Sequence, residues 1–267
     1  ANTFLLVANL APIDKGKMIV EGNERVINAR LSDAEFFWNK DLKNNFEDEK
    51  KKLEKLIFHN EIGNVSEKIL RLKILVTFLS KDLKSIEKKY LFEAADLCKN
   101  DLVSETVREF PSLQGVMGKY YILKSGQHIE VANAVQNHYK PQGPSDDIPN
   151  TLLSRLLSIA DKIDNLVGFF IIDKYPTGSK DPFALRRTAL GVIRVLIEGE
   201  VSVDIAALIE KSLKSYINSF NQNKLKNNFE SKVIKQKVLG FLLERYEILI
   251  KEDKKIDFVV FNSLKIN

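Results

Sequence analysis

Three side chains far apart in the sequence have the types that hold divalent metal ions. They are the imidazole of His59 and the carboxylates of Asp101 and Asp161. A metal ion held by such ligands can activate a water molecule to hydrolyse a phosphoester. The pattern therefore indicates a candidate site for metal-dependent hydrolysis of a phosphoester.

The order of these residues resembles that of the HD-domain superfamily. There a His, a His-Asp pair and a last Asp hold the ion, and here the last position falls in Ala160-Asp161-Lys162. Asn100 stands where that family has the His of the pair, and an amide is a poor substitute for the imidazole that transition metals favour, so one of the four ligands is missing. The resemblance implies a helical domain that keeps this fold without a working metal site. Single residues also have structural interpretations, with Asp101 as a helix N-cap and Asp161 as a solvated or salt-bridged helix residue. A metal-dependent hydrolase stays open as an alternative function.

A second constellation lies in the stretch from Tyr175 to Arg187. Pro176 and the glycine two residues later mark a turn. Asp181 can accept hydrogen bonds from the free N–H groups of a helix start, and Pro182 suits the first helical position. The sequence therefore predicts a loop followed by a helix over residues 183–196.

The same stretch is rich in positive charge. Lys180 lies in the loop, Arg186 and Arg187 lie near the start of the predicted helix, and Arg194 lies two turns further on. Arginine and lysine neutralise phosphates, so these residues suit a nucleic-acid partner. The structural alternative is a solvated helix face.

Almost all of the chain between residue 32 and about residue 250 has helical patterns. Over residues 156–170, apolar side chains keep the spacing of one buried helix face. Asp161 and Asp164 are three positions apart on this segment, so they are neighbours on the helix. Asn64 and Glu67 form a capping box that starts another helix. Further helices are predicted over residues 46–58, 83–98, 102–110, 113–123, 129–139, 205–220 and 231–250.

The first forty residues have a different pattern. Residues 3–8 are a short apolar run, Asp14-Lys15-Gly16 supplies a turn, and Lys17–Val20 is a second strand candidate. Ser32 and Glu35 then form a capping box that predicts a helix start. The chain does not begin with Met, so we expect an internal fragment of a longer protein.

Together these patterns predict a mostly α protein. We expect an HD-domain-like helical bundle with a small N-terminal β-hairpin and a C-terminal helical extension. Residues 1–40 would end a preceding α+β region, residues 41–200 would form the HD-like domain, and residues 201–267 would form the extension.

The composition is that of a globular protein. Of 267 residues, 44% are hydrophobic and 29% are charged, and the net charge is +5. This mild positive charge permits a nucleic-acid partner without requiring one. The single cysteine, Cys98, excludes an internal disulfide and fits a reducing compartment, and its helical surroundings predict a small buried apolar residue. Because no apolar run reaches spanning length, we expect a cytoplasmic protein without a membrane partner.

Several longer motifs resemble the beta subunits of the bacterial heterotetrameric glycyl-tRNA synthetases. They are specific, occur in the family's order and are spread over roughly residues 4–196. The matching stretches are Gly22–Val26, Ala29–Phe37, Glu109–Gly115, Met117-Gly118, Tyr120-Tyr121, Ala160–Lys162 and Pro176–Arg187.

The resemblance implies that the chain is part of a larger ligase. In this family the alpha subunit handles glycine and ATP and carries out adenylate formation and transfer, whereas the beta subunit mainly recognises tRNA. The partners would then be the alpha subunit and tRNA(Gly), and this chain would bind no cofactor and hold no catalytic residue. Residues 201–267 would lead towards the family's anticodon-binding region. An assembly scaffold that contacts the alpha subunit instead of RNA stays open as another alternative.

The resemblance also selects candidate site residues. The loop motif and the earlier arginine-containing motif suggest a tRNA-binding set of Lys180, Arg186, Arg187, Arg25 and Arg30. The degraded metal positions, which would hold no ion, are His59, Asn100, Asp101 and Asp161.

Overall fold

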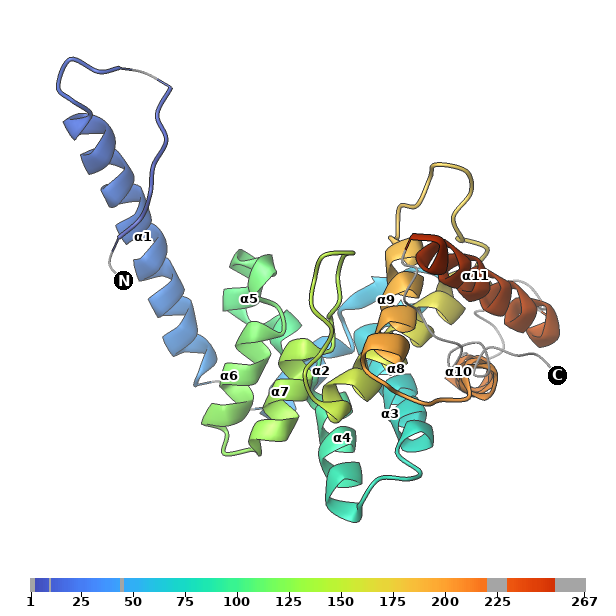
Figure 1. Cartoon of the computed structure of the whole chain (residues 1–267). Coiled ribbons are helices and arrows are strands. Elements are labelled where there is room, and N and C mark those ends of the chain that lie inside the picture. The colour runs from blue at the N-terminus through green and yellow to red at the C-terminus, as the bar shows by residue number, and fades with distance from the viewer. Residues whose placement is uncertain (1–2, 10, 44–45, 220–229, 253–267) are drawn as a thin grey trace. The chain divides into compact units, whose positions relative to one another are not determined.

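The computed structural model describes residues 3–9, 11–43, 46–219 and 230–252. The chain divides into two compact units, residues 1–44 and residues 45–267. Within the described ranges both units are mostly helical, and the second also contains a small sheet (Figure 1). The α-helices are α1 (Lys17–Asp41), α2 (Phe46–Leu53), α3 (Val65–Leu79), α4 (Ser85–Leu97), α5 (Glu105–Glu109), α6 (Val116–Lys124), α7 (Ile129–Asn137), α8 (Leu152–Ile171), α9 (Leu185–Glu198), α10 (Ile205–Ser219) and α11 (Ser231–Glu252). The strands are β1 (Ile57–His59) and β2 (Gly63–Asn64), and short 3-10 helices occupy Asn100–Val103 and Pro111–Leu113.

The first unit has a helix where the sequence predicted a hairpin. Lys17–Val20 forms the first turn of α1, and residues 3–8 are not in a strand, so the predicted N-terminal β-hairpin is wrong. Asp14 explains why a helix begins here. Its carboxylate accepts hydrogen bonds from the N–H groups of Gly16 and Met18 at 3.0 and 2.8 Å, and such bonds satisfy donors that a helix start leaves free.

The helix start predicted at Ser32 is also wrong. α1 runs without a break from Lys17 to Asp41, and Ser32 lies in its interior. After Gly22 the helix contains neither glycine nor proline, so nothing in its sequence interrupts it. A capping box has no function there, because each interior N–H already bonds to the carbonyl four residues earlier.

The small antiparallel sheet lies in the second unit. β1 pairs with β2 so that Ile57 lies opposite Asn64. The helix predicted over residues 46–58 is shorter than expected, because α2 ends at Leu53 and the chain then enters β1.

The capping box predicted before α3 is confirmed. The Asn64 side chain accepts from the Glu67 N–H at 2.8 Å, and the Glu67 carboxylate accepts from the Asn64 N–H at 2.9 Å. Gly63 has a φ of +123°, and a Cβ on it would lie 2.0 Å from Glu67 Oε2. A glycine is therefore required at this turn so that Glu67 can reach back.

α8 is the central helix of the second unit (Figure 1), and its predicted periodic face is buried. α3, α7 and α9 pack against it. α10 and α11 contribute to the same core, in which Leu208 and Leu242 accompany Leu166. The mostly helical fold is thus confirmed, whereas the HD-like arrangement of the bundle stays a prediction. Residues 253–267 of the predicted extension lie outside the described residues.

Two smaller expectations can be compared with the structure. Cys98 is buried, as predicted, and this burial raises the pKa of its thiol to about 12. The thiol is therefore protonated and unreactive at neutral pH. Among the described helices, none combines the length and the apolar character that crossing a bilayer requires.

Candidate functional site: a buried ion network and a basic loop

The inward face of α8 carries two carboxylates that meet the cations of α3. Asp164 accepts from Arg71 Nε at 2.7 Å and from Lys68 Nζ at 2.9 Å. Asp161, one turn earlier, lies 3.1 Å from Lys68 Nζ. The side chains of Lys68, Arg71 and Asp164 are at most 2% exposed. These residues form a buried ion network between two core helices.

Asp164 also connects α8 to α10. The Tyr216 hydroxyl donates to the backbone carbonyl of Asp164 at 3.0 Å, and the Arg71 guanidinium lies 4.1 Å from the centre of the Tyr216 ring. Burial alone would raise the pKa of Asp164, but the charges of Arg71 and Lys68 outweigh it and lower the pKa. The carboxylate is therefore ionised at neutral pH, and it compensates cations from α3.

Asp161 has a second cation from another element. Lys99 Nζ lies 3.2 Å from its carboxylate and 2.7 Å from Nε2 of the buried His138. Burial opposes ionisation of Asp161, but Lys68 and Lys99 hold its pKa well below the ordinary value. Burial and then the charge of Lys99 lower the pKa of His138, so its ring is neutral and can accept from Lys99. The interpretation of Asp161 as a salt-bridged helix residue is confirmed, in buried rather than solvated form.

Asp101 caps a helix other than its own. Its carboxylate accepts the N–H groups of Gly115 and Gly118 at the start of α6. A Cβ on Gly118 would lie 3.2 Å from Asp101 Oδ2 and 2.8 Å from Val135 Cγ1, so the approach depends on glycine. Burial raises the pKa of Asp101, and the two N–H groups partly offset this effect.

The other two positions of the predicted metal set have different surroundings. The ring of His59 packs edge-on against Phe169 and Phe183, with centroids 5.6 and 5.7 Å away. Its Nδ1 accepts from the N–H of Glu61 at 3.2 Å. Asn100 is buried, and neither the nitrogen nor the oxygen of its side-chain amide has a hydrogen-bond partner among the residues that the structure describes.

These residues do not fit a metal ion. Ammonium groups already compensate Asp161, backbone N–H groups occupy one oxygen of Asp101, and Asn100 supplies an amide where an imidazole is needed. Within the described ranges, no group of three or more His, Cys, Asp or Glu side chains could hold an ion. The charges of Asp161 and Asp101 are thus met by groups of the helical core itself.

The basic loop has a defined backbone. Thr177 and Lys180 exchange backbone hydrogen bonds at 3.2 and 3.0 Å, which closes a tight turn. The Asp181 carboxylate accepts from the N–H groups of Leu185 and Arg186 at 2.8 and 3.0 Å. α9 therefore begins at Leu185, two residues later than predicted, after Ala184 in a left-handed conformation. Asp181 caps the helix as predicted, but Pro182 is not its first residue.

The predicted basic side chains of this segment are not equivalent. Lys180 and Arg187 are exposed. Arg186 is half-buried and donates through Nη2 to the carbonyl of Gly178 at 2.6 Å. Arg194 instead makes its bonds within the chain, as follows.

Arg194 fastens the loop before α8 to α9. Its guanidinium bonds to Glu198 and donates to the carbonyls of Gly143, Pro144 and Asp146 at 2.8–3.2 Å. The hydrogen bond to Glu198 raises the pKa of Arg194. This residue is therefore occupied within the chain and is not a free phosphate ligand.

The two remaining candidates, Arg25 and Arg30, lie on α1 in the first unit and are exposed. Five positions on a helix correspond to a rotation of about 140°, so the two side chains are on different faces. The structure thus brings together Lys180, Arg186 and Arg187, while the α1 pair belongs to the other unit.

Sequence reasoning missed the cations of the ion network. Lys68 and Arg71 stand in the first half of α3 among Ile69 and Leu72, which are buried. Two charged residues three positions apart inside an apolar helix face were the available signal, because such residues are rarely buried without partners. Lys99 gave no comparable signal.

The chain was compared with known proteins. It matches the family described as "Glycyl-tRNA synthetase beta subunit" over residues 1–264. The glycine–tRNA ligase beta subunit of Rickettsia felis is 44% identical over 232 residues, which cover 87% of this chain and 34% of that protein. The beta subunit of Rickettsia canadensis is 40% identical over 267 residues, with coverages of 99% and 38%. That of Rickettsia bellii is 43% identical over 229 residues, with coverages of 86% and 34%.

The chain therefore spans about a third of the length of the curated relatives it matches. The family match includes both units of the structure. The resemblance predicted from the motifs is confirmed, and the chain belongs to the glycyl-tRNA synthetase beta subunit family.

Proposed function

We propose that this chain takes part in the ATP-dependent attachment of glycine to tRNA(Gly), mainly by binding tRNA. Its relatives are named as beta subunits of glycine–tRNA ligase, and a beta subunit implies an alpha subunit as partner. The complete enzyme would use ATP and glycine. This chain would contact tRNA and the alpha subunit without supplying a catalytic residue.

One observation carries the tRNA-binding part of the proposal, namely uncompensated positive charge on a loop of defined shape. Within the described residues, neither Lys180 nor Arg187 has a carboxylate at ion-pair distance, and both are exposed. In the described part of the chain the Arg186 guanidinium bonds to the Gly178 carbonyl and to no carboxylate, so its charge is also uncompensated. A phosphate can therefore approach all three cations without breaking an existing ion pair, which favours a polyanionic partner.

The ion network argues against the hydrolase alternative. A phosphohydrolase needs a water molecule activated by a metal or by a base near the substrate. Here the carboxylates of Asp161 and Asp164 are buried and paired with three cations from α3 and the segment after α4. Both oxygens of Asp164 and Oδ1 of Asp161 already face these cations, which argues against their binding a metal ion.

The double substitution Arg186→Ala/Arg187→Ala tests the proposal. Binding of fluorescein-labelled tRNA(Gly) would be measured by anisotropy over a series of KCl concentrations. The loss of two phosphate contacts should weaken binding about tenfold and reduce the salt slope by about 1 to 2. Arg108→Ala/Lys124→Ala removes two exposed charges from α5 and α6, away from the loop (Figure 1), and should leave the affinity almost unchanged.

The possible results separate the hypotheses. Equal tRNA binding by the Arg186/Arg187 variant and the unaltered chain would contradict the proposal. If that variant kept its tRNA affinity but no longer co-purified with the alpha subunit, the loop would be an assembly contact, as the scaffold alternative predicts.

A further inference from the structure

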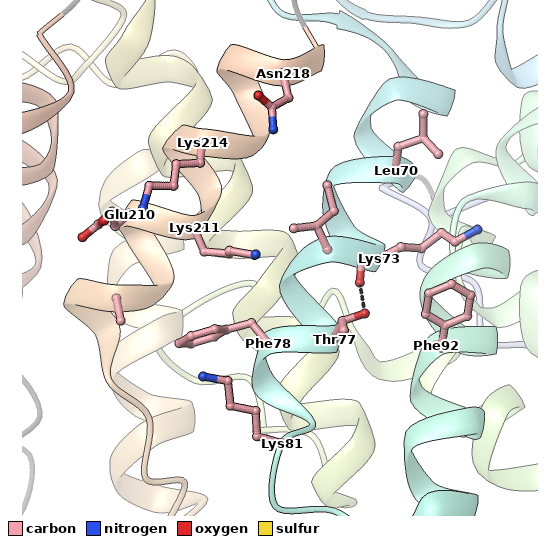
Figure 2. A pocket seen from close by; sticks show the side chains of 12 residues that line it. Leu70, Lys73, Thr77, Phe78, Lys81, Phe92, Glu210, Lys211, Lys214 and Asn218 are labelled. Carbon is pink, nitrogen blue, oxygen red and sulfur yellow. Dashed lines mark hydrogen bonds and ion pairs between the residues drawn. The ribbon is translucent and has the colours of Figure 1, made fainter.

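A groove with a volume of about 1010 Å³ lies beside α3, between α10 on one side and α4 on the other. This volume is at the upper limit of pockets for single small molecules, so the groove suits an extended ligand. Figure 2 shows Phe78 and Lys81 extending from α3, and Lys211 extending from α10, into the space between these helices. The lining side chains that carry the argument are Lys73, Lys81, Lys211, Lys214, Phe78 and Phe92.

The sequence of α3 explains why this helix can have a charged core face and a charged outer face. Lys73 and Thr77 are four positions apart, so they lie on the same side of α3, and Lys81 follows just beyond the end of this helix. Lys68 and Arg71 point to the core on the other side. On α10, Lys211 and Lys214 have a spacing of three, so they also share one face.

The groove has an excess of positive charge. Four lysines and one glutamate line it. Lys73 is paired with Asp96 at 2.8 Å, and Lys214 with Glu210 at 2.8 Å. Within the described part of the chain, Lys81 and Lys211 have no carboxylate at ion-pair distance, and both are exposed. Two cations on facing elements are therefore free to bind an anion.

Aromatic rings accompany the cations. Lys81 Nζ lies 4.4 Å from the centre of the Phe78 ring, and Lys73 Nζ lies 4.7 Å from that of Phe92. The Phe92 residue is 44% exposed. Cations for phosphates next to ring faces for bases are the combination with which proteins bind unpaired RNA. An acidic peptide would use the lysines but would gain little from the rings.

Two of the helices that line the groove, α3 and α10, are held at a fixed distance from each other. Arg71 of α3 bonds to the Asp164 carboxylate, and Tyr216 of α10 bonds to the Asp164 carbonyl. The buried contact between Arg71 and Tyr216 joins the two helices directly. A preformed groove binds its ligand without the cost of ordering the protein.

We propose that this groove binds an unpaired segment of RNA, with its backbone on Lys81 and Lys211 and a base on Phe92. The proposal rests on the function proposed above and adds a second RNA contact, because the groove shares no residue with the basic loop. The ligand class is a single-stranded stretch of the bound tRNA.

The test uses the full chain and two probes, a fluorescein-labelled oligouridylate of twelve nucleotides and labelled tRNA(Gly). Lys81→Ala/Lys211→Ala should weaken oligouridylate binding about tenfold and lower the salt slope by about 1 to 2. Phe92→Ala should weaken it at least about fivefold, as loss of a stacked base does, with the salt slope unchanged. Arg108→Ala/Lys124→Ala is the charge-matched control, and circular dichroism checks that each variant is folded.

Five outcomes would overturn the proposal. Oligouridylate binding that is unaffected by the Lys81/Lys211 pair, or unaffected by Phe92→Ala, would exclude the groove as its site. So would polyglutamate of equal charge competing as well as RNA. If the groove variants bind both probes normally while Arg186→Ala/Arg187→Ala loses tRNA binding, the groove is not an RNA-binding site, and the proposed function stands. If the unaltered chain binds neither probe at low salt, the proposed function itself fails.

Discussion

Replacing Asp164 by Asn removes the negative charge at the centre of the ion network while keeping the shape of the side chain. The carboxylate makes three bonds of 2.7–3.3 Å to Lys68 and Arg71, whose side chains are at most 2% exposed. Water cannot replace it, and removing one partner of a buried pair costs about 3–5 kcal/mol. Asp161 remains 3.1 Å from Lys68, so Lys68 keeps an ion-pair partner, whereas Arg71 loses the one it has among the described residues. We therefore expect a loss at the lower end, about 3 kcal/mol.

Urea unfolding followed by far-UV circular dichroism measures this loss. With a slope of about 3 kcal/mol per M, the midpoint should fall by about 1 M. Asp173→Asn is the matched control: Asp173 faces Lys237 at 3.8 Å, with side chains 64% and 40% exposed. Such a surface pair contributes at most about 1 kcal/mol, and Asn tolerates the positive φ of this position. Equal midpoint shifts in the two variants would refute the stabilising role of the network.

Two further predictions follow from the same core. The pKa values of Asp161 and Asp164 are lowered in the folded state. Their stabilising effect is therefore complete above their unfolded pKa of about 3.9 and is lost as the pH falls below it. The free energy of unfolding, measured over an acid pH series, should fall accordingly, and replacing both residues by Asn should make this pH dependence weaker. Gly118→Ala places a Cβ 2.8 Å from Val135 Cγ1, so despite the better helix propensity of Ala it should lower the melting temperature, at a cost of about 1–3 kcal/mol. The helical Gly240 has no neighbour within 4 Å of such a Cβ, so Gly240→Ala should raise the melting temperature, and the same sign for both would contradict the packing argument.

Local signals in the sequence predicted the local structure well. The capping box of Asn64 and Glu67 and the buried face of α8 depend on residues within one or a few helical turns. The turn at Thr177 and the cap by Asp181 are of the same kind. Such features form wherever their few residues occur together, so the pattern alone is enough to find them.

Two helix starts, those of α1 and α9, were predicted wrongly. Lys17–Val20 is too short for its period to distinguish a strand from a helix turn, and the chain upstream of it supplied a helix cap through Asp14. The start of α9 at Leu185 was missed by two residues because Ala184 adopts a left-handed conformation that only a non-local context explains.

The sequence did not allow us to predict which residues pair with each other in the ion network. Asp161 was recognised as a helix residue, yet Arg71 and Asp164 are 93 positions apart in the chain. A single sequence contains no information about which cation meets which carboxylate over that separation. For the same reason the sequence could not show that the charges around Asp161 come from Lys68 and Lys99, on two other segments.

The position of Asp164 makes the groove depend on the buried core. Its carboxylate fixes α3 through Arg71, and its carbonyl fixes α10 through Tyr216 at 3.0 Å. Lys211 is on α10, and Lys81 directly follows the end of α3, so the two cations lie on either side of the proposed RNA path. A change at Asp164 should therefore alter the distance between the two cations without touching either of them.

The direction in which Asp164→Asn changes the RNA affinity shows whether the geometry of the groove or the net charge of the chain controls binding. Asp164→Asn removes a negative charge, and long-range electrostatics alone would then strengthen the binding of RNA. If the groove geometry depends on Asp164, the variant should instead bind oligouridylate several-fold more weakly at a temperature where circular dichroism shows it folded. Asp173→Asn removes the same charge from the surface and should bind at least as tightly as the unaltered chain. Tighter binding by both variants would mean that net charge alone governs RNA binding and that the buried network does not set the groove.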